Sequence, residues 1–269
     1  MRAVGYDPAA AVADVLDNSI TAGAREIQIR FDPGPAKAVA IIDDGRGMTP
    51  DELLEAMRHG SRHPMDDRNA DDLGRFGLGL KTAALSQCRR LVVVTRRHGN
   101  TSGMVWDLDE VARSGDWIAG VLEGHEIECV PFVSHLLAHE SGTLVVWDKL
   151  DRLAADDPGD GTFLSDRMKR VADHLALVFH RFLSDRPALH ITINDIPLDP
   201  VDPFLENEGS QVGPEESIYI GVHPVGLRSY TLPHISRLTR AQITKAGGEE
   251  GLRRQQGFYV YRARRLIIW

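Results

Sequence analysis

Residues 74–82 combine residue types that could bind a phosphate group. Three glycines (Gly74, Gly77 and Gly79) and Lys81 stand directly ahead of a helix-forming run. Glycine permits positive φ and close approach of the backbone to a ligand, and the first turn of a helix offers unpaired N–H groups to an anion. The spacing GxxGxG is not the dinucleotide fingerprint GxGxxG, and Leu80 stands between Gly79 and Lys81, which excludes a Walker A loop. Taken alone, such a run is more often a tight turn than a phosphate site.

A second group of candidate residues shares one face of a helix expected over residues 8–22. Asp7 can cap this helix, Pro8 suits its first position and Gly23 ends it. The face opposite the apolar one is an arc of about 100° that holds four polar residues: Asp14, Asp17, Asn18 and Thr21. An ordinary amphipathic surface helix is the alternative interpretation. Such a helix usually exposes long charged side chains, whereas these short oxygen-bearing groups suit a hard cation such as Mg²⁺.

The other segments predict a mixture of strands and helices. Residues 43–48 form a turn directly after an expected strand, and Thr49 begins a well-capped helix. Residues 59–72 are polar and lack a period, which favours a mobile loop or lid. The expected strands cover residues 26–31, 38–42, 91–95, 103–106, 142–147, 218–222, 228–232 and 257–269, a long helix covers residues 163–183, and residues 189–193 and 196–198 form a hairpin.

The composition is that of a globular protein. The chain has 269 residues, 42% hydrophobic and 26% charged, which allows one large domain or one domain and part of another. No apolar run approaches the roughly 20 residues of a membrane span, and the first residues are no signal peptide. We therefore expect no membrane contact and a cytoplasmic location, with Cys88 and Cys129 as buried thiols.

The net charge of −8 is unevenly distributed. Residues 237–269 hold eight basic and two acidic residues, a net charge of +6, so the rest of the chain carries −14. An acidic body repels nucleic acid, whereas a basic segment can meet phosphate locally. A solvated face is the usual alternative. The eight basic residues are Arg237, Arg240, Lys245, Arg253, Arg254, Arg262, Arg264 and Arg265.

Four motifs in a fixed order resemble those of the GHKL ATPases, the superfamily of gyrase, heat-shock chaperones, histidine kinases and MutL. The motifs are the helix with Asp14 and Asn18, the turn that begins at Asp43, the glycine-rich stretch, and the strand that opens at Gly142-Thr143. The resemblance implies an α+β Bergerat fold in residues 1–205, a sandwich with helices on one face of a mixed sheet. Residues 206–269 resemble the first part of a transducer-like α/β domain, cut short at its end. Residues 1–6, 73–88 and 256–262 look most like bacterial relatives of the MORC ATPases.

The resemblance assigns the adenine of ATP to residues around the turn. Asp43 would accept a hydrogen bond from the adenine amino group, which selects adenine over guanine. Gly47, with Gly45 in the same turn, would let the base approach, Met48 would pack against it, and Thr143 would contact it through water. Met48 is equally consistent with a plain core residue.

The phosphates and the metal are assigned to the first helix and the glycine-rich stretch. Asn18 would hold Mg²⁺ through its amide oxygen, and Asp14 would be the general base that polarises the attacking water. Many family members have glutamate at that position, and Asp17 is the nearest substitute base. The glycine-rich stretch would give backbone N–H groups and the charge of Lys81 to the phosphates, although Lys81 could also face solvent. The residues of this stretch are Gly74, Gly77, Leu78, Gly79, Leu80 and Lys81.

The implied function is Mg²⁺-dependent ATP hydrolysis that orders the lid and drives formation of an ATP-dependent homodimer, a clamp on DNA. In the family a basic residue of the transducer domain reaches the γ-phosphate, and Lys245 and Arg237 are candidates; without it the chain should hydrolyse ATP slowly. The alternatives are a chaperone-like ATPase acting on protein clients and a degenerate module that binds ATP with little hydrolysis. A histidine kinase is disfavoured, because only 13 residues precede Asp14.

Overall fold

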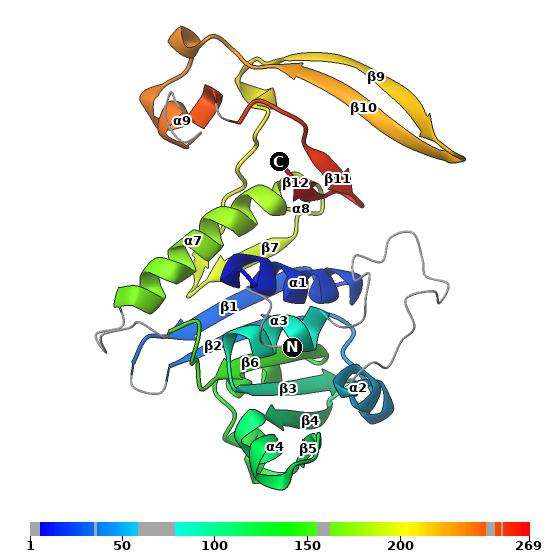
Figure 1. Ribbon diagram of the computed structural model, residues 1–269, viewed down its shortest axis with the longest axis vertical. Helices are drawn as coiled ribbons and strands as arrows, with labels where there is room; N and C mark the ends of the chain where they lie inside the picture. Colours follow the sequence, from blue (N-terminus) through cyan, green and yellow to red (C-terminus); the bar gives the residue numbers. More distant parts are fainter. Residues whose placement is uncertain (1–5, 35–36, 59–78, 155–161, 246–250, 254) are drawn as a thin grey trace.

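An eight-stranded mixed sheet forms the centre of the computed structural model, which describes residues 6–34, 37–58, 79–154, 162–245, 251–253 and 255–269 (Figure 1). The strand order is β5-β4-β3-β6-β2-β1-β7-β8, in which the β1–β7 pair is parallel and the other pairs are antiparallel. The strands are β1 (Glu26–Asp32), β2 (Ala38–Asp43), β3 (Arg90–Arg97), β4 (Asn100–Asp107), β5 (Gly120–Leu122), β6 (Gly142–Asp148), β7 (His190–Ile193) and β8 (Ile196–Pro197).

Helices cover both faces of this sheet. α1, α3 and α7 lie on one face (Figure 1). The short α5 and α6 contribute to the apolar cluster on the other face. The helices are α1 (Pro8–Thr21), α2 (Pro50–Met57), α3 (Gly79–Gln87), α4 (Leu108–Ser114), α5 (His125–Glu128), α6 (Val133–Leu137), α7 (Thr162–Val178), α8 (His180–Ser184) and α9 (Arg240–Lys245), with 3-10 turns at Glu206–Glu208 and Ile235–Arg237. The expected α+β class is confirmed. The expectation of helices on one face fits the long helices, whereas α5 and α6 on the other face belong to residues 108–137, whose elements the sequence did not predict.

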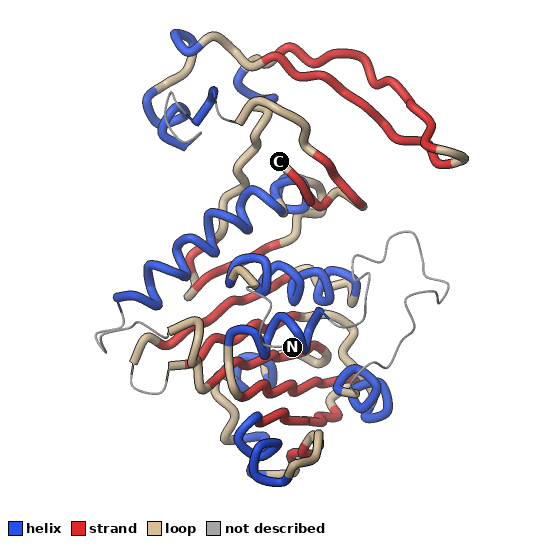
Figure 2. The backbone as a smooth tube through the Cα atoms, in the orientation of Figure 1, coloured by secondary structure: helices blue, strands red, loops and turns tan. Residues whose placement is uncertain are grey.

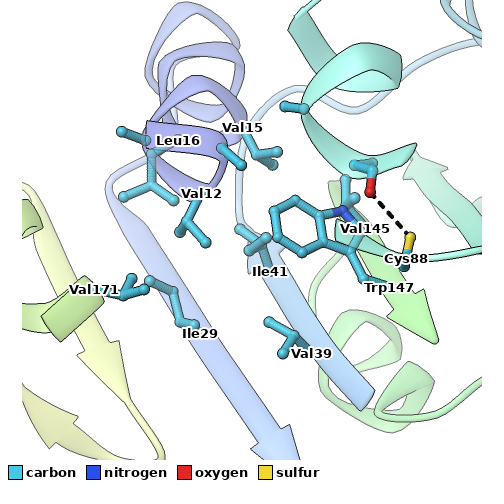
Figure 3. Packing of buried hydrophobic residues seen from close by; sticks show 14 of the residues in the cluster. Val12, Val15, Leu16, Ile29, Val39, Ile41, Cys88, Val145, Trp147 and Val171 are labelled. Atoms are coloured by element: carbon cyan, nitrogen blue, oxygen red, sulfur yellow. Dashed lines mark hydrogen bonds between the residues drawn. The ribbon is translucent and has the colours of Figure 1, made fainter. Parts of the chain in front are cut away.

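The central strands are buried on both faces because each face has its own apolar layer. In β2, Val39 and Ile41 join the larger core beneath α1, while Ala40 and Ile42 join the smaller core beneath α6. This alternation follows from the two-residue period of a strand. In Figure 3, Val12, Val15 and Leu16 of α1 lie above the sheet together with Ile29, Ile41 and Trp147.

Helix α1 begins and ends where its sequence predicts. The Asp7 carboxylate accepts a hydrogen bond of 2.8 Å from the backbone N–H of Ala9, and Pro8 occupies the first turn. Gly23 follows the helix with a φ of +80°, a conformation that glycine adopts without strain. The helix is therefore fixed at both ends by local chemistry.

Two other elements differ from their predicted form. The single helix expected over residues 163–183 is interrupted at Phe179, where φ is −103° and ψ is 14°, and continues as α8. Phe179 is fully buried, so core packing overrides the helical period at this residue. The strand expected over residues 257–269 is instead a hairpin of β11 (Val260–Arg262) and β12 (Arg265–Ile268). Its two turn residues, Ala263 and Arg264, both have positive φ, as in the tight turns that suit hairpins.

The C-terminal segment also carries a second, longer hairpin. It pairs β9 (Gln211–Ile220) with β10 (His223–Thr231) and extends away from the large sheet (Figures 1 and 2). Neither hairpin joins the eight-stranded sheet. The boundary between a first domain of residues 1–205 and a second one of residues 206–269 stays a prediction.

Two expectations from composition have different outcomes. Among the residues that the structure describes, no helix is long and apolar enough to cross a membrane. The expectation of two buried thiols is correct for Cys88 and wrong for Cys129, which is exposed. Cys129 caps the short helix α5 on the surface, where no apolar layer covers it.

Truncation of the α1 side that faces the sheet should destabilise the whole domain. Leu16 is fully buried, so Leu16→Ala should lower the free energy of unfolding by about 2–5 kcal/mol through lost burial and the cavity left behind. Leu54→Ala in α2 is the matched control, because Leu54 is 45% exposed and its truncation should cost about 0.5 kcal/mol or less. Urea unfolding of both variants measures the difference, and equal losses would contradict the assigned core.

Candidate nucleotide-binding site

The polar residues of helix α1 differ in their exposure to solvent. Asn18 is exposed and Asp14 is half-buried, one helical turn apart on the same face. Asp17, which the helical period places beside them, is only 2% exposed. Because α1 packs on both the sheet and α7, its interior side is wider than the apolar stripe alone indicates. Asp14 and Asn18 therefore form the accessible pair, and Asp17 does not belong to it.

Both carboxylate oxygens of Asp14 have hydrogen-bond donors. The Tyr6 hydroxyl donates to Oδ2, and an Arg265 Nη atom lies 3.4 Å from Oδ1. Burial, together with the hydrogen bond to Asp14, raises the pKa of Tyr6 to about 12. The phenol therefore stays protonated and donating at neutral pH. The side chain of Asp14 keeps 24% of its surface exposed, so that solvent still reaches it.

Asp43 is a buried carboxylate at the end of β2. The Ser19 hydroxyl donates to its Oδ2 at 2.8 Å, and the backbone N–H of Gly45 donates to its Oδ1 at 3.0 Å. Burial raises the pKa of Asp43 to about 6, although the hydrogen bonds from Ser19 and Gly45 act in the opposite direction. The contact with Ser19, the residue after Asn18, ties the end of α1 directly to the end of β2.

The turn after Asp43 is closely packed against the neighbouring backbone. A Cβ atom on Gly47 would lie 2.0 Å from the carbonyl oxygen of Arg96, and Gly47 has a φ of +65°. A Cβ atom on Gly45 would lie 2.9 Å from the Cβ of Ala22 at the end of α1. Both contacts exclude larger residues. The protein backbone itself therefore requires glycine at these positions.

Thr95, which the sequence analysis missed, connects this turn to β6. Its hydroxyl accepts a hydrogen bond of 2.8 Å from the backbone N–H of Met48 and donates one of 3.1 Å to the Gly142 carbonyl. It also lies 3.3 Å from the Thr143 hydroxyl, and Thr143 is directly opposite Asp43 in the sheet. Met48 is half-buried and packs against the larger core. The only sequence signal for Thr95 was a polar residue that ends a run of buried valines.

The described part of the glycine-rich stretch begins at Gly79, the first residue of α3. Gly74, Gly77, Leu78 and the expected lid over residues 59–72 lie outside the described residues. Leu80 is half-buried against the core. Lys81 is 1% exposed and its Nζ donates to the carbonyl of Arg58, at the end of α2, so Lys81 does not face solvent. Burial lowers the pKa of Lys81.

Among the described residues there is no group of three or more His, Cys, Asp and Glu that could hold a metal ion. Proteins commonly bind Mg²⁺ through one or two side chains while phosphates and water complete its shell. The exposed amide of Asn18, one turn from Asp14, suits such a partial site.

The mixed sheet with its helical layer is the Bergerat fold of the GHKL ATPase superfamily. A family model described as histidine kinase-, DNA gyrase B-, and HSP90-like ATPase matches residues 6–143, just over half of the chain, and the chain belongs to this family. The match spans Asp14, Asn18, the Asp43 turn and Thr143. The predicted superfamily is thereby confirmed, whereas the finer resemblance to MORC ATPases stays a prediction.

Curated relatives include several proteins named DNA mismatch repair protein MutL. The one from Paramagnetospirillum magneticum is 29% identical over 177 residues, which are 62% of this chain and 29% of the relative. The one from Halobacterium salinarum is 34% identical over 91 residues, 33% of this chain and 14% of the relative. The one from Rhodospirillum rubrum is 30% identical over 170 residues, 59% and 27% respectively. The chain thus spans less than a third of the length of these relatives.

The buried Asp43 carboxylate should make stability depend on pH. Its pKa is raised from 3.8 to about 6 on folding, so the folded protein holds this proton more tightly than the unfolded chain. The resulting stabilisation is present below pH 3.8 and is lost as the pH rises through 6. Asp43→Asn lacks this titration. The free energy of unfolding of the variant, relative to wild type, should therefore increase by about 2–3 kcal/mol between pH 4 and pH 7. A difference that is the same at both pH values in urea unfolding would refute the assignment.

Proposed function

We propose that this chain binds ATP with Mg²⁺ and hydrolyses it, with helix α1 carrying both the metal ligand and the base. The observation that carries the proposal is the 2.8 Å hydrogen bond between Ser19 and Asp43. It joins the turn of α1 that follows Asn18 to the buried Asp43 carboxylate, which supports assigning both to one nucleotide site. The membership in an ATPase family supports the same function.

The adenine would bind at the turn after β2. We assign the exocyclic amino group to Asp43. Its oxygens accept from Ser19 and Gly45 and keep further lone pairs, which a base with a donor at this position would fill and a 6-oxo group would repel. Thr143, opposite Asp43 on β6, would complete the contact through a water molecule. Gly45 and Gly47 form the turn beneath the base, and the half-buried Met48 would pack against its ring.

The phosphates and the metal would bind between α1 and the start of α3. Asn18 would ligate Mg²⁺, which when bound neutralises phosphate charge and orients the γ-phosphate. The backbone N–H groups of Gly79 and Leu80 at the first turn of α3 would face the phosphates, together with Gly74, Gly77 and Leu78. Lys81 can reach a phosphate only if its ammonium group gives up the Arg58 carbonyl.

Asp14 would act as the general base. The oxygen of water forms a bond to the γ-phosphorus while the bond from phosphorus to the bridging oxygen breaks, and ADP leaves with that electron pair. The Asp14 carboxylate accepts the proton of the attacking water and passes it to the released phosphate. Its partial exposure leaves room for this water, and Tyr6 and Arg265 hold its two oxygens.

Loss of the base should slow turnover strongly and leave nucleotide binding largely unchanged. Asp14→Asn should slow phosphate release by about 100-fold or more, while the affinity for a non-hydrolysable ATP analogue changes by about threefold at most, since the adenine contacts are untouched. Asp51→Asn, on the exposed start of α2, is the control and should keep the native rate. Native turnover in Asp14→Asn would show that the base is assigned to the wrong residue.

We further propose that bound ATP closes the lid over residues 59–72 and promotes a homodimer that acts on DNA, since the relatives are named as mismatch repair proteins. Part of the positive charge of residues 237–269 is already paired within the chain and is therefore not available for DNA phosphates. Arg264 pairs with Asp185 and Arg265 with Asp14 and Asp17, so these two arginines neutralise carboxylates of the chain itself. The exposed Arg237 and Arg240 remain better candidates for phosphate contacts.

Nucleotide should change the size of the protein in solution. With a non-hydrolysable ATP analogue and Mg²⁺, the molar mass from light scattering should double relative to the nucleotide-free protein. Asn18→Ala should bind the analogue without Mg²⁺ dependence and stay monomeric. A monomer under all conditions, at concentrations that saturate the nucleotide site, would remove the dimer from the proposal and leave ATP binding intact.

A further inference from the structure

The β11–β12 hairpin packs beside α7 and α8 (Figure 1). The Tyr261 hydroxyl lies 2.8 Å from Nε2 of His180 in α8, and Leu266 of β12 is 1% exposed. The terminal Trp269 ring lies 5.4 Å from the ring of His174 in α7. The hairpin therefore has an apolar and aromatic contact of its own, which does not depend on Arg265.

Arg265 extends from this hairpin to two carboxylates of α1. One Nη atom donates to Oδ2 of Asp17 and the other lies 3.4 Å from Oδ1 of Asp14. The Arg265 side chain is 14% exposed. The two nitrogens of a planar guanidinium suit two neighbouring acceptors, whereas a lysine ammonium is a single point charge. One side chain thus holds two carboxylates that are three residues apart.

The two carboxylates differ in what they need from Arg265. The Asp17 side chain is 3% exposed, and its Oδ1 is buried without a hydrogen-bond partner among the described residues. A buried carboxylate of this kind needs a cation. The Asp14 side chain is 24% exposed and also accepts from Tyr6. Asp17 therefore anchors the arginine, and Asp14 is the residue that the arginine orients toward solvent.

We propose that Arg265 is a positioning residue that holds Asp14 in the orientation needed for hydrolysis, so that turnover requires the docked β12 strand. The inference rests on the proposed role of Asp14. Arg265 itself exchanges no proton and touches no substrate. Because aspartate has a short side chain with free rotation about two bonds, one donor on each oxygen defines the direction of its lone pairs. A displacement of β12 would then change the orientation of the Asp14 carboxylate and leave the proposed nucleotide contacts unchanged.

The decisive variant is Arg265→Lys, which keeps the positive charge and loses the planar guanidinium whose two nitrogens contact two carboxylates. The kcat for phosphate release should fall roughly 10- to 100-fold, as expected for a small misplacement of a catalytic group, while KM and the affinity for a non-hydrolysable ATP analogue stay within about twofold of wild type. Arg264→Lys is the matched control in the same hairpin, because Arg264 contacts Asp185 and Phe182 instead of the base. It should keep the native kcat.

A purely structural role is tested in the Asp17→Asn background, where no buried charge needs the arginine. If Arg265→Lys still lowers kcat there, with unchanged hydrogen exchange of residues 260–268, the positioning role holds. If the loss of kcat disappears in that background, Arg265 acts only by neutralising Asp17 and the proposal is overturned. A wild-type protein that binds the analogue without any turnover would instead refute the proposed hydrolysis. Native kcat in Arg265→Lys, beside active wild type, refutes the positioning role alone.

Discussion

The hydrogen bond between Ser19 and the buried carboxylate of Asp43 fixes the geometry on which the rest of the site depends. It joins the last turn of α1 to the last residue of β2 at 2.8 Å. A buried carboxylate is costly unless donors surround it, so Asp43 holds both Ser19 and the backbone of Gly45 in place. The carboxylate proposed to contact adenine and the helix proposed to face the phosphates are thereby joined directly.

Helix α1 serves the core and the site at the same time. Its apolar residues, among them Val12 and Leu16, are buried against the sheet, and this burial sets the rotation of the helix about its axis (Figure 3). Asp14 and Asn18 then point outward because they lie on the other side of the cylinder. The orientation of the proposed base is a consequence of core packing, refined by its own hydrogen bonds.

The C-terminal hairpin adds a long-range constraint to this arrangement. Arg265 is 248 residues from Asp17 in the chain, yet the two side chains meet in a place from which solvent is nearly excluded. The pair is kept because neither ion is stable there alone. Since Asp14 contacts the same arginine, the accessible face of α1 and the segment after residue 206 belong to one electrostatic unit.

The superfamily was predicted from the resemblance of four ordered motifs to a known family. The sequence alone also determined the features that depend on local chemistry: the ends of α1 at Asp7 and Gly23, and the alternating strands. These follow from capping, periodicity and backbone freedom, which act over a few residues. Tertiary structure alone decided that Asp17 is buried, that Thr95 links the turn to β6, that Lys81 faces the end of α2, and that Arg265 reaches Asp14. Those outcomes depend on which side chains pack together in the interior and on which oppositely charged groups lie close enough to form ion pairs. No local pattern encodes such pairings, because the partners are brought together only when the sheet and its helices pack.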